Sequence, residues 1–266
     1  MMSEEHETFP NAVEATLLIV VLFALQIMIA TVLLSIDSFA RVDPWDLSGL
    51  ISVAGNGILF TLLLTYKKLR YRELFHPARH SVTATLGLLA IPIVLMVPGL
   101  VTTAGTLNAI VVKFLPMSAN EQAALEAMVS NHGLAILFGC IAAPFLEEML
   151  FRGIILRSFL LQYSRTASIV GSATLFGVAH LNIYQFVTAF MVGIVAGWLY
   201  ERTRSLWPCI LLHASYNLFV MYSYRYFETS PTSDFTTTFY IAAFVLTILS
   251  ALLLLRVLMP SRGRSG

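Results

Sequence analysis

Three charged side chains interrupt an otherwise apolar stretch near the middle of the chain. Glu147, Glu148 and Arg152 lie in the segment PFLEEMLFRG, inside a predicted helix over residues 134–156. Glu148 and Arg152 are four positions apart with the acid first, so they share a helix face and can form an ion pair. Glu147 points about 100° away from that face. Burial and an ionised neighbour both disfavour its charged form, which suits a group that exchanges a proton.

Two histidines and an asparagine lie in other apolar segments. His180 ends FGVAH, and His213 begins HASYN with Asn217 one helical turn later on the same face. The other histidines fall in predicted loops or tails: His6, His76, His80 and His132. A carboxylate and an imidazole can activate water for attack on a carbonyl. A second imidazole and an amide can donate to the resulting oxyanion, so the set suffices for peptide hydrolysis without a nucleophilic Ser or Cys.

The same side chains allow other interpretations. Two histidines and a glutamate match the His₂Glu ligands of catalytic zinc, although no HExxH segment is present. Cys140 and Cys209 lie in apolar runs and have neither disulfide nor metal-ligand spacing. We therefore expect no cofactor and keep zinc as the alternative. A structural ion pair and packed histidines are the non-catalytic explanation.

The composition indicates the elements that must hold these residues. Of 266 residues, 58% are hydrophobic and 12% are charged, with a mean hydropathy of +0.80. This excludes a water-soluble globule, a disordered chain and a nucleic-acid binder, and predicts an all-α polytopic membrane helix bundle. We expect about eight transmembrane helices, over residues 15–36, 47–66, 82–101, 134–156, 167–181, 183–200, 206–221 and 239–258.

Charge placement supports this count and orients the chain. With both termini on the cytoplasmic side, twelve Lys and Arg residues lie inside and three lie outside, Arg41, Lys113 and Arg225. This asymmetry is typical of membrane proteins. Residues 102–133 form an outer loop in which Ser118 and Glu121 predict a capping box and a short helix. We predict a single domain over residues 1–266, in which the glycines of a GxxxG segment at 193–197 pack helices together.

Helix geometry gives the depth of the reactive groups. At 1.5 Å per residue, Glu147, His213 and His180 lie about 15, 10 and 20 Å from the inner ends of their predicted helices. The three side chains are therefore compatible with one layer in the inner half of the membrane. This predicts chemistry near the cytoplasmic face.

The three motifs, in this order, resemble those of the CAAX-processing type II prenyl endopeptidases and their bacterial relatives, the CPBP (Abi) intramembrane proteases. The family pattern is EExxxR, then FxxxH, then HxxxN or HxxxD. The corresponding segments here are EEMLFR at 147–152, FGVAH at 176–180 and HASYN at 213–217. The similarity covers the motif core, residues 144–217, and the eight-span architecture is similar to that of the family.

The resemblance implies a catalytic role for four residues. Glu147 would be the general base that polarises a water molecule together with His180. His213 and Asn217 would form the oxyanion hole. Every motif position matches the family pattern, so the catalytic apparatus looks intact.

Three further residues would support this set. The resemblance implies that Glu148 and Arg152 position the helix that carries Glu147. Phe176 would close the pocket or pack beside His180, and an ordinary core aromatic is the alternative. We favour the metal-free scheme because Glu147 has an immediate acid–base role in it.

The resulting expectation is an intramembrane endopeptidase that hydrolyses a peptide bond near the cytoplasmic membrane face. Its expected partners are a peptide or lipid-modified protein substrate and membrane lipids, with no nucleic acid. The expected location is a multi-pass position in the plasma membrane of a prokaryote. The alternatives are a metal-dependent version of this protease, a non-proteolytic membrane regulator or bacteriocin-immunity protein, and a transporter, for which no paired halves are visible.

Overall fold

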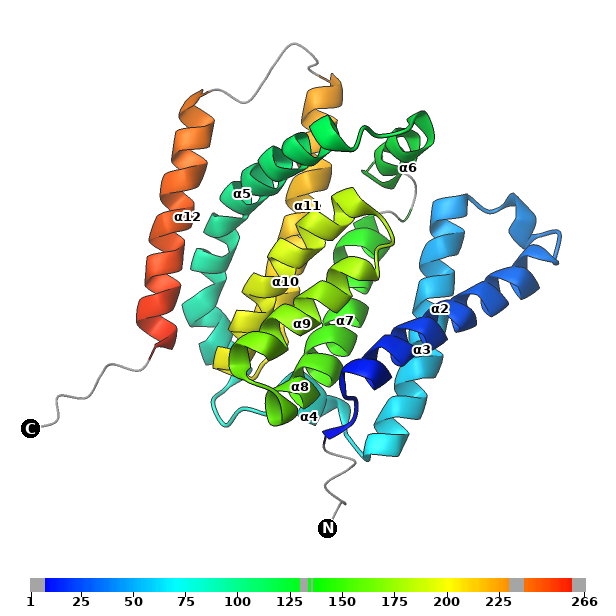
Figure 1. Ribbon diagram of the computed structural model, residues 1–266, viewed down its shortest axis with the longest axis horizontal. Helices are drawn as coiled ribbons and strands as arrows, with labels where there is room; N and C mark the ends of the chain where they lie inside the picture. Colours follow the sequence, from blue (N-terminus) through cyan, green and yellow to red (C-terminus); the bar gives the residue numbers. More distant parts are fainter. Residues whose placement is uncertain (1–7, 130–133, 135, 230–236, 260–266) are drawn as a thin grey trace, which may run out of the picture.

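The computed structural model describes residues 8–129, 134, 136–229 and 237–259, and every secondary-structure element in these ranges is a helix. The all-α prediction is confirmed. Figure 1 shows the arrangement. The helices before residue 130 are α2 (Ala12–Leu34), η1 (Phe39–Arg41), α3 (Pro44–Lys67), α4 (Tyr71–Phe75), α5 (Val82–Phe114) and α6 (Ala119–Val129).

The second half of the chain contains a helix that runs without a break over residues 137–162. It consists of η2 (Leu137–Ala142), α7 (Ala143–Glu148), η3 (Met149–Leu156) and α8 (Arg157–Gln162), and both η segments are π-helical. The remaining helices are α9 (Arg165–Val178), α10 (Ile183–Thr203), α11 (Trp207–Thr229) and α12 (Thr237–Leu258). Each predicted span therefore has a helical counterpart.

Within the described ranges, five helices are long and apolar enough to cross a membrane: α2, α3, α5, α10 and α12. A 30 Å hydrocarbon layer needs about 20 residues of helix, whereas α9 has 14 residues. The chain is a multi-pass membrane protein. The count of eight spans and the cytoplasmic location of both termini stay predictions.

The helices form a central bundle with one covering element on each side (Figure 1). α9 packs along α10, and α5 contacts α10, α11 and α12. α12 lies at one edge, and the α2–α3 hairpin lies at the opposite edge. Gly193 and Gly197 of α10 face α9, where an added Cβ would lie 3.0 Å from Ala173 and 3.1 Å from Ile169. The GxxxG segment therefore packs helices within the chain, as predicted.

The predicted end of the third span was wrong. α5 continues from Val82 to Phe114, so residues 102–114 are helical rather than part of an outer loop. The segment after residue 101 is less apolar but contains no proline before Pro116, so the helix continues and stops where Leu115 precedes Pro116. The capping box is confirmed: Ser118 N donates to Glu121 Oε2 at 2.8 Å, and Glu121 N donates to Ser118 Oγ at 3.2 Å.

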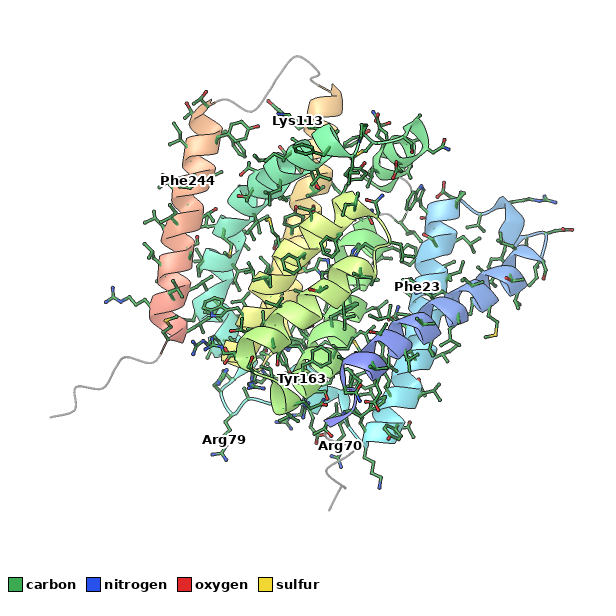
Figure 2. All side chains as sticks on the ribbon, viewed as in Figure 1. Phe23, Arg70, Arg79, Lys113, Tyr163 and Phe244 are labelled. Carbon is green, nitrogen blue, oxygen red and sulfur yellow. The ribbon has the colours of Figure 1, made fainter. Side chains whose placement is uncertain are left out.

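The two ends of the bundle differ in charge (Figure 2). Arg70 and Arg79 lie at the end where α2 begins and α12 ends, whereas Lys113 lies at the opposite end with α6. At the basic end, the chain before α2 is fixed to the core. Ser158 Oγ donates to the Thr8 carbonyl at 2.6 Å, and Lys67 Nζ donates to the Phe9 carbonyl at 2.5 Å.

Candidate active site

The two glutamates lie where the long central helix changes its winding. Glu147 and Glu148 end α7, which lies between the π-helical segments η2 and η3. π-helical turns are rare and occur often at functional sites, because the wider turn redirects the side chains that follow. The helix predicted over residues 134–156 was a regular α-helix, and its π-helical turns were not predicted.

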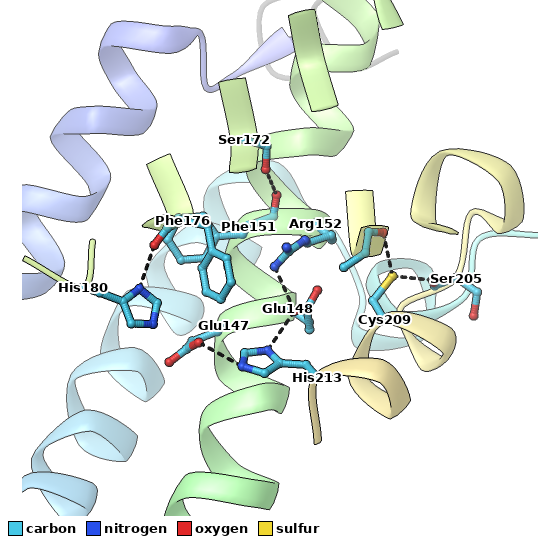
Figure 3. Close-up of polar contacts among 11 residues, drawn as sticks. Glu147, Glu148, Phe151, Arg152, Ser172, Phe176, His180, Ser205, Cys209 and His213 are labelled. Atoms are coloured by element: carbon cyan, nitrogen blue, oxygen red, sulfur yellow. Dashed lines mark hydrogen bonds and ion pairs between the residues drawn. The ribbon is translucent and has the colours of Figure 1, made fainter. Parts of the chain in front are cut away.

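Glu148 is a fully buried acid with two partners. Arg152 Nη1 donates to its Oε1 at 2.8 Å, and the exposed fractions of the two side chains are 1% and 0%. The ion pair predicted from the spacing is confirmed. The same Oε1 lies 3.0 Å from His213 Nδ1 of α11 (Figure 3). Glu148 therefore joins its own helix to α11 as well as to Arg152.

Glu147 lies in different surroundings from its neighbour. Its side chain is 33% exposed, and its Oε2 lies 3.7 Å from His213 Nε2. The expectation that Glu147 is buried without a partner is corrected: it borders open space, and the partner comes from another helix. The two carboxylates thus contact the two ring nitrogens of His213: Glu148 contacts Nδ1 and Glu147 contacts Nε2 (Figure 3).

Hydrogen bonding fixes the orientation of both histidines. His180 Nδ1 lies 2.8 Å from the Phe176 carbonyl, which can only accept, so this nitrogen carries the hydrogen. The Nε2 of a neutral His180 is then an acceptor. His213 Nδ1 faces a carboxylate and also carries a hydrogen, which leaves Nε2 of His213 directed toward Glu147.

Phe176 packs among the reactive groups. Its side chain is 1% exposed, and its ring meets the rings of His180 and His213 edge-on, with centroids 5.1 and 5.5 Å apart. The Arg152 guanidinium lies 4.6 Å from the same ring centroid, a distance at which a cation and an aromatic face attract. Phe176 is thus a core aromatic that also holds both imidazoles in place.

A cavity of about 500 Å³ brings the predicted catalytic residues together. Glu147, His180, His213 and Asn217 all line it, although they come from α7, α11 and the turn after α9. Asn217 donates one Nδ2 hydrogen to the Gly139 carbonyl at 2.8 Å, which leaves its second N–H available. Much of the remaining lining is apolar or aromatic, as in most ligand sites.

The cavity extends toward α6, at the end of the bundle opposite the basic residues. Gln122, Leu125 and Glu126 of α6 line it. From the observed helix ends, Glu147 lies about 22 Å from Gln162 and about 15 Å from Leu137 along the axis. Measured from the observed helix ends, Glu147 therefore lies nearer the middle of the bundle than the inner-half position expected from the sequence.

A second, smaller cavity also borders Glu147. It measures about 190 Å³ and shares Glu147, Phe176 and His180 with the larger one. Its other polar side chains are Gln26 of α2 and Ser52 and Asn56 of α3. No function was predicted for these three residues, although an amide inside an apolar span was a usable signal.

The described residues do not form the ligand set that a zinc site would need. Among the described residues, no group of three or more His, Cys, Asp and Glu side chains is placed to hold a metal ion. Both Nδ1 atoms, of His180 and His213, already have acceptors in the protein. We therefore derive no step through a metal.

The segment that carries this site is similar to known proteins. Residues 130–219 match the family model described as Type II CAAX prenyl endopeptidase Rce1-like. Over 108 residues the chain is 32% identical to a Bacillus subtilis (strain 168) protein named "Putative membrane peptidase YdiL", covering 39% of this chain and 42% of that protein. No solved structure matches the chain significantly. The matched segment contains all three motifs, and the resemblance of this membrane protein to the CAAX-processing type II prenyl endopeptidases is confirmed for the part that carries the site.

Proposed function

We propose that the protein is an intramembrane endopeptidase that hydrolyses a peptide bond with water activated by Glu147 and His180. The observation that carries the proposal is the convergence of Glu147, His180, His213 and Asn217 on one cavity from α7, α11 and the turn after α9. Glu147 is one-third exposed, so water can reach its carboxylate. His180 Nε2 accepts a hydrogen bond from the same water.

The chemical steps balance with these groups alone. Glu147 takes one proton from water while the water oxygen bonds to the carbonyl carbon of the peptide. The oxyanion accepts from the free N–H of Asn217 and from Nε2–H of a protonated His213, whose charge the adjacent carboxylates of Glu148 and Glu147 balance. The C–N bond then breaks, and Glu147 returns its proton to the leaving amine.

The cavity indicates the kind of substrate. Its apolar and aromatic lining favours a hydrophobic or lipid-modified segment, and its position favours cleavage near the middle of the bundle rather than at the cytoplasmic face. We place the enzyme in the plasma membrane of a prokaryote. We expect a membrane-embedded peptide as substrate and no cofactor.

The test is reconstitution of the purified protein in liposomes with candidate peptides, with and without a chelator. We expect cleavage that the chelator leaves unchanged and that Glu147→Ala abolishes. The matched control is Glu121→Gln. Glu121 accepts hydrogen bonds from Ser118, just before α6, and it is not among the residues that line the cavity. Unchanged cleavage by the Glu147 variant would overturn the role of Glu147 as the base. Absence of cleavage by the wild-type protein would favour a non-proteolytic role, and loss of cleavage with the chelator would favour a metal-dependent mechanism.

A further inference from the structure

The proposed hydrolysis needs a supply of water at Glu147 that the larger cavity does not provide while the substrate fills it. Each bond cleaved consumes one water molecule, and Glu147 lies about 15 Å or more from either end of its helix. A substrate that occupies the larger, mostly apolar cavity excludes water from that side of Glu147. Water must therefore reach the carboxylate by another route while the substrate is bound.

The smaller cavity lies against the same carboxylate and has a different lining. Glu147 and His180 border it from the core, and Gln26, Ser52 and Asn56 border it from the α2–α3 hairpin. The rest of the lining is apolar: Ile19, Leu22, Phe23, Leu150, Phe151, Phe176 and Ala179. A cavity holds ordered water when it is large enough and each water finds two to four polar partners, and this cavity of about 190 Å³ meets both conditions.

The side chain of Gln26 lines the smaller cavity. It makes no hydrogen bond with any residue in the described part of the chain, whereas hydroxyls of the same helices bond their own backbone, as Thr31 does with the Ile27 carbonyl and Thr61 with the Gly57 carbonyl. Leaving an amide unpaired in an apolar span costs several kcal/mol. Such a group therefore requires a polar ligand in the cavity that it faces.

The neighbouring groups position this amide and extend the polar surface. A Cβ added at Gly55 of α3 would lie 2.9 Å from Gln26 Cγ, so the Gln26 side chain packs closely against α3 and would have to shift if Gly55 were replaced. Asn56 is 5% exposed and donates one hydrogen to the Ser52 carbonyl at 2.9 Å. Its second N–H and its carbonyl oxygen form no hydrogen bond within the described residues.

We propose that the smaller cavity is a hydrated chamber that stores water for the reaction and delivers it to Glu147 and His180 while the substrate fills the larger cavity. Gln26 and Asn56 are the positioning residues of this chamber. The inference rests on the proposed function for its purpose, but its central claim is that water occupies this site inside the membrane.

Hydration is tested first, with a measurement that needs no activity. In X-ray footprinting, radicals formed from water in place oxidise nearby side chains. Phe23 lines the chamber, whereas Phe244 lies on α12 at the edge of the bundle and is 66% exposed (Figure 2). At that position we expect lipid to exclude water. In lipid nanodiscs we expect strong oxidation of Phe23 and little of Phe244. Equal, low oxidation of both would overturn the proposal whether or not the protein cleaves peptides.

Kinetics then test the use of this water. Gln26→Met and Asn56→Leu keep the approximate side-chain size and remove the amide. We expect each to lower kcat about tenfold with KM unchanged, because the chemistry loses its water rather than its substrate. Gln26→Asn, which restores an amide, should recover part of kcat. Thr31→Val, on the exposed face of α2, is the matched control.

Two outcomes would contradict the delivery of water. A rise in KM with kcat unchanged would mean that the amides bind the peptide backbone. Unchanged kinetics in both variants would mean that the reaction takes its water from elsewhere. If wild-type protein cleaves no peptide while Phe23 is oxidised, the proposed function fails and the hydrated chamber stands.

Discussion

Glu147 and Glu148 are adjacent in the sequence and lie in opposite surroundings. Glu148 has 0% exposure and is enclosed by Arg152 and His213, whereas Glu147 is 33% exposed and borders both cavities. The Glu148 oxygen that faces Arg152 and His213 is enclosed by these two partners. The neighbouring carboxylate of Glu147 borders the cavities, where water can approach it. The two residues are of the same type, so their different burial and contacts give Glu148 a positioning role and Glu147 a reactive one.

The largest effect that tests this contrast is on activity. Glu147→Gln keeps the shape of the side chain and removes the base, so we expect kcat/KM to fall by about 10²–10⁴-fold. The free energy of unfolding should change little, because the side chain is one-third exposed and its contact with His213 Nε2 is long, at 3.7 Å. Peptide cleavage in liposomes and chemical unfolding in detergent measure the two quantities. A stability loss as large as the activity loss would show that Glu147 is a structural acid as well.

The opposite pattern is expected on the buried side. Arg152→Met leaves the charge of Glu148 buried with His213 as its one remaining hydrogen-bond partner, and we expect a loss of about 3–5 kcal/mol in the free energy of unfolding. Adding Glu148→Leu removes that charge and should restore much of the stability. Activity should stay low, because His213 loses the acceptor that orients its Nδ1. Recovery of both stability and activity in the double variant would contradict a positioning role for Glu148.

The contrast between the two acids was only partly predictable from the sequence. The Glu148–Arg152 pair follows from a spacing of four on a helix, which is local geometry. The contact of His213 with Glu148 joins positions 65 residues apart and depends on how α11 packs against α7. The π-helical turns on either side of α7 leave no mark in the hydropathy pattern.

The helices were easier to predict than their ends and their cavities. Long apolar runs located the helices, because a membrane-spanning helix requires such runs. The end of α5 depends on Pro116 rather than on hydropathy, so the predicted boundary was too early. Gln26 and Asn56 lie on different helices, and only packing brings both to the cavity beside Glu147.

A smaller effect is expected from the glycine that faces Arg152. A Cβ at Gly193 would lie 3.0 Å from Ala173 Cβ and 3.4 Å from Arg152 Nη2. Gly193→Ala should therefore destabilise the fold by about 1–3 kcal/mol, because the α9–α10 contact has no spare room. Gly87→Ala is the control, since an added Cβ there meets nothing within 4 Å. Equal unfolding free energies for the two variants would show that the buried side tolerates expansion.

The smallest effect is expected at the mouth of the larger cavity, where α6 is held by its cap. Ser118→Ala removes the capping hydroxyl, and the loss of such a cap costs about 1 kcal/mol. Since α6 lines the cavity but carries none of the reactive groups, we expect KM to rise at most about fivefold and kcat to stay unchanged. A fall in kcat would contradict the separation of this helix from the chemistry.

The pH dependence of this cap has a defined sign. Hydrogen bonds from the Ser118 hydroxyl and then from the Ser118 backbone N–H lower the pKa of Glu121 from its ordinary value of 4.5. A lowered pKa in the folded state means that the stabilisation is present above that ordinary value and is lost as the pH falls through the lowered one. Hydrogen exchange of the α6 amides, corrected for the intrinsic rate, should therefore show protection that weakens in acid. Ser118→Ala should flatten this dependence, because the largest cause of the shift is gone. An unchanged profile in the variant would show that Glu121 does not act through Ser118, and that α6 is held over the cavity by other contacts.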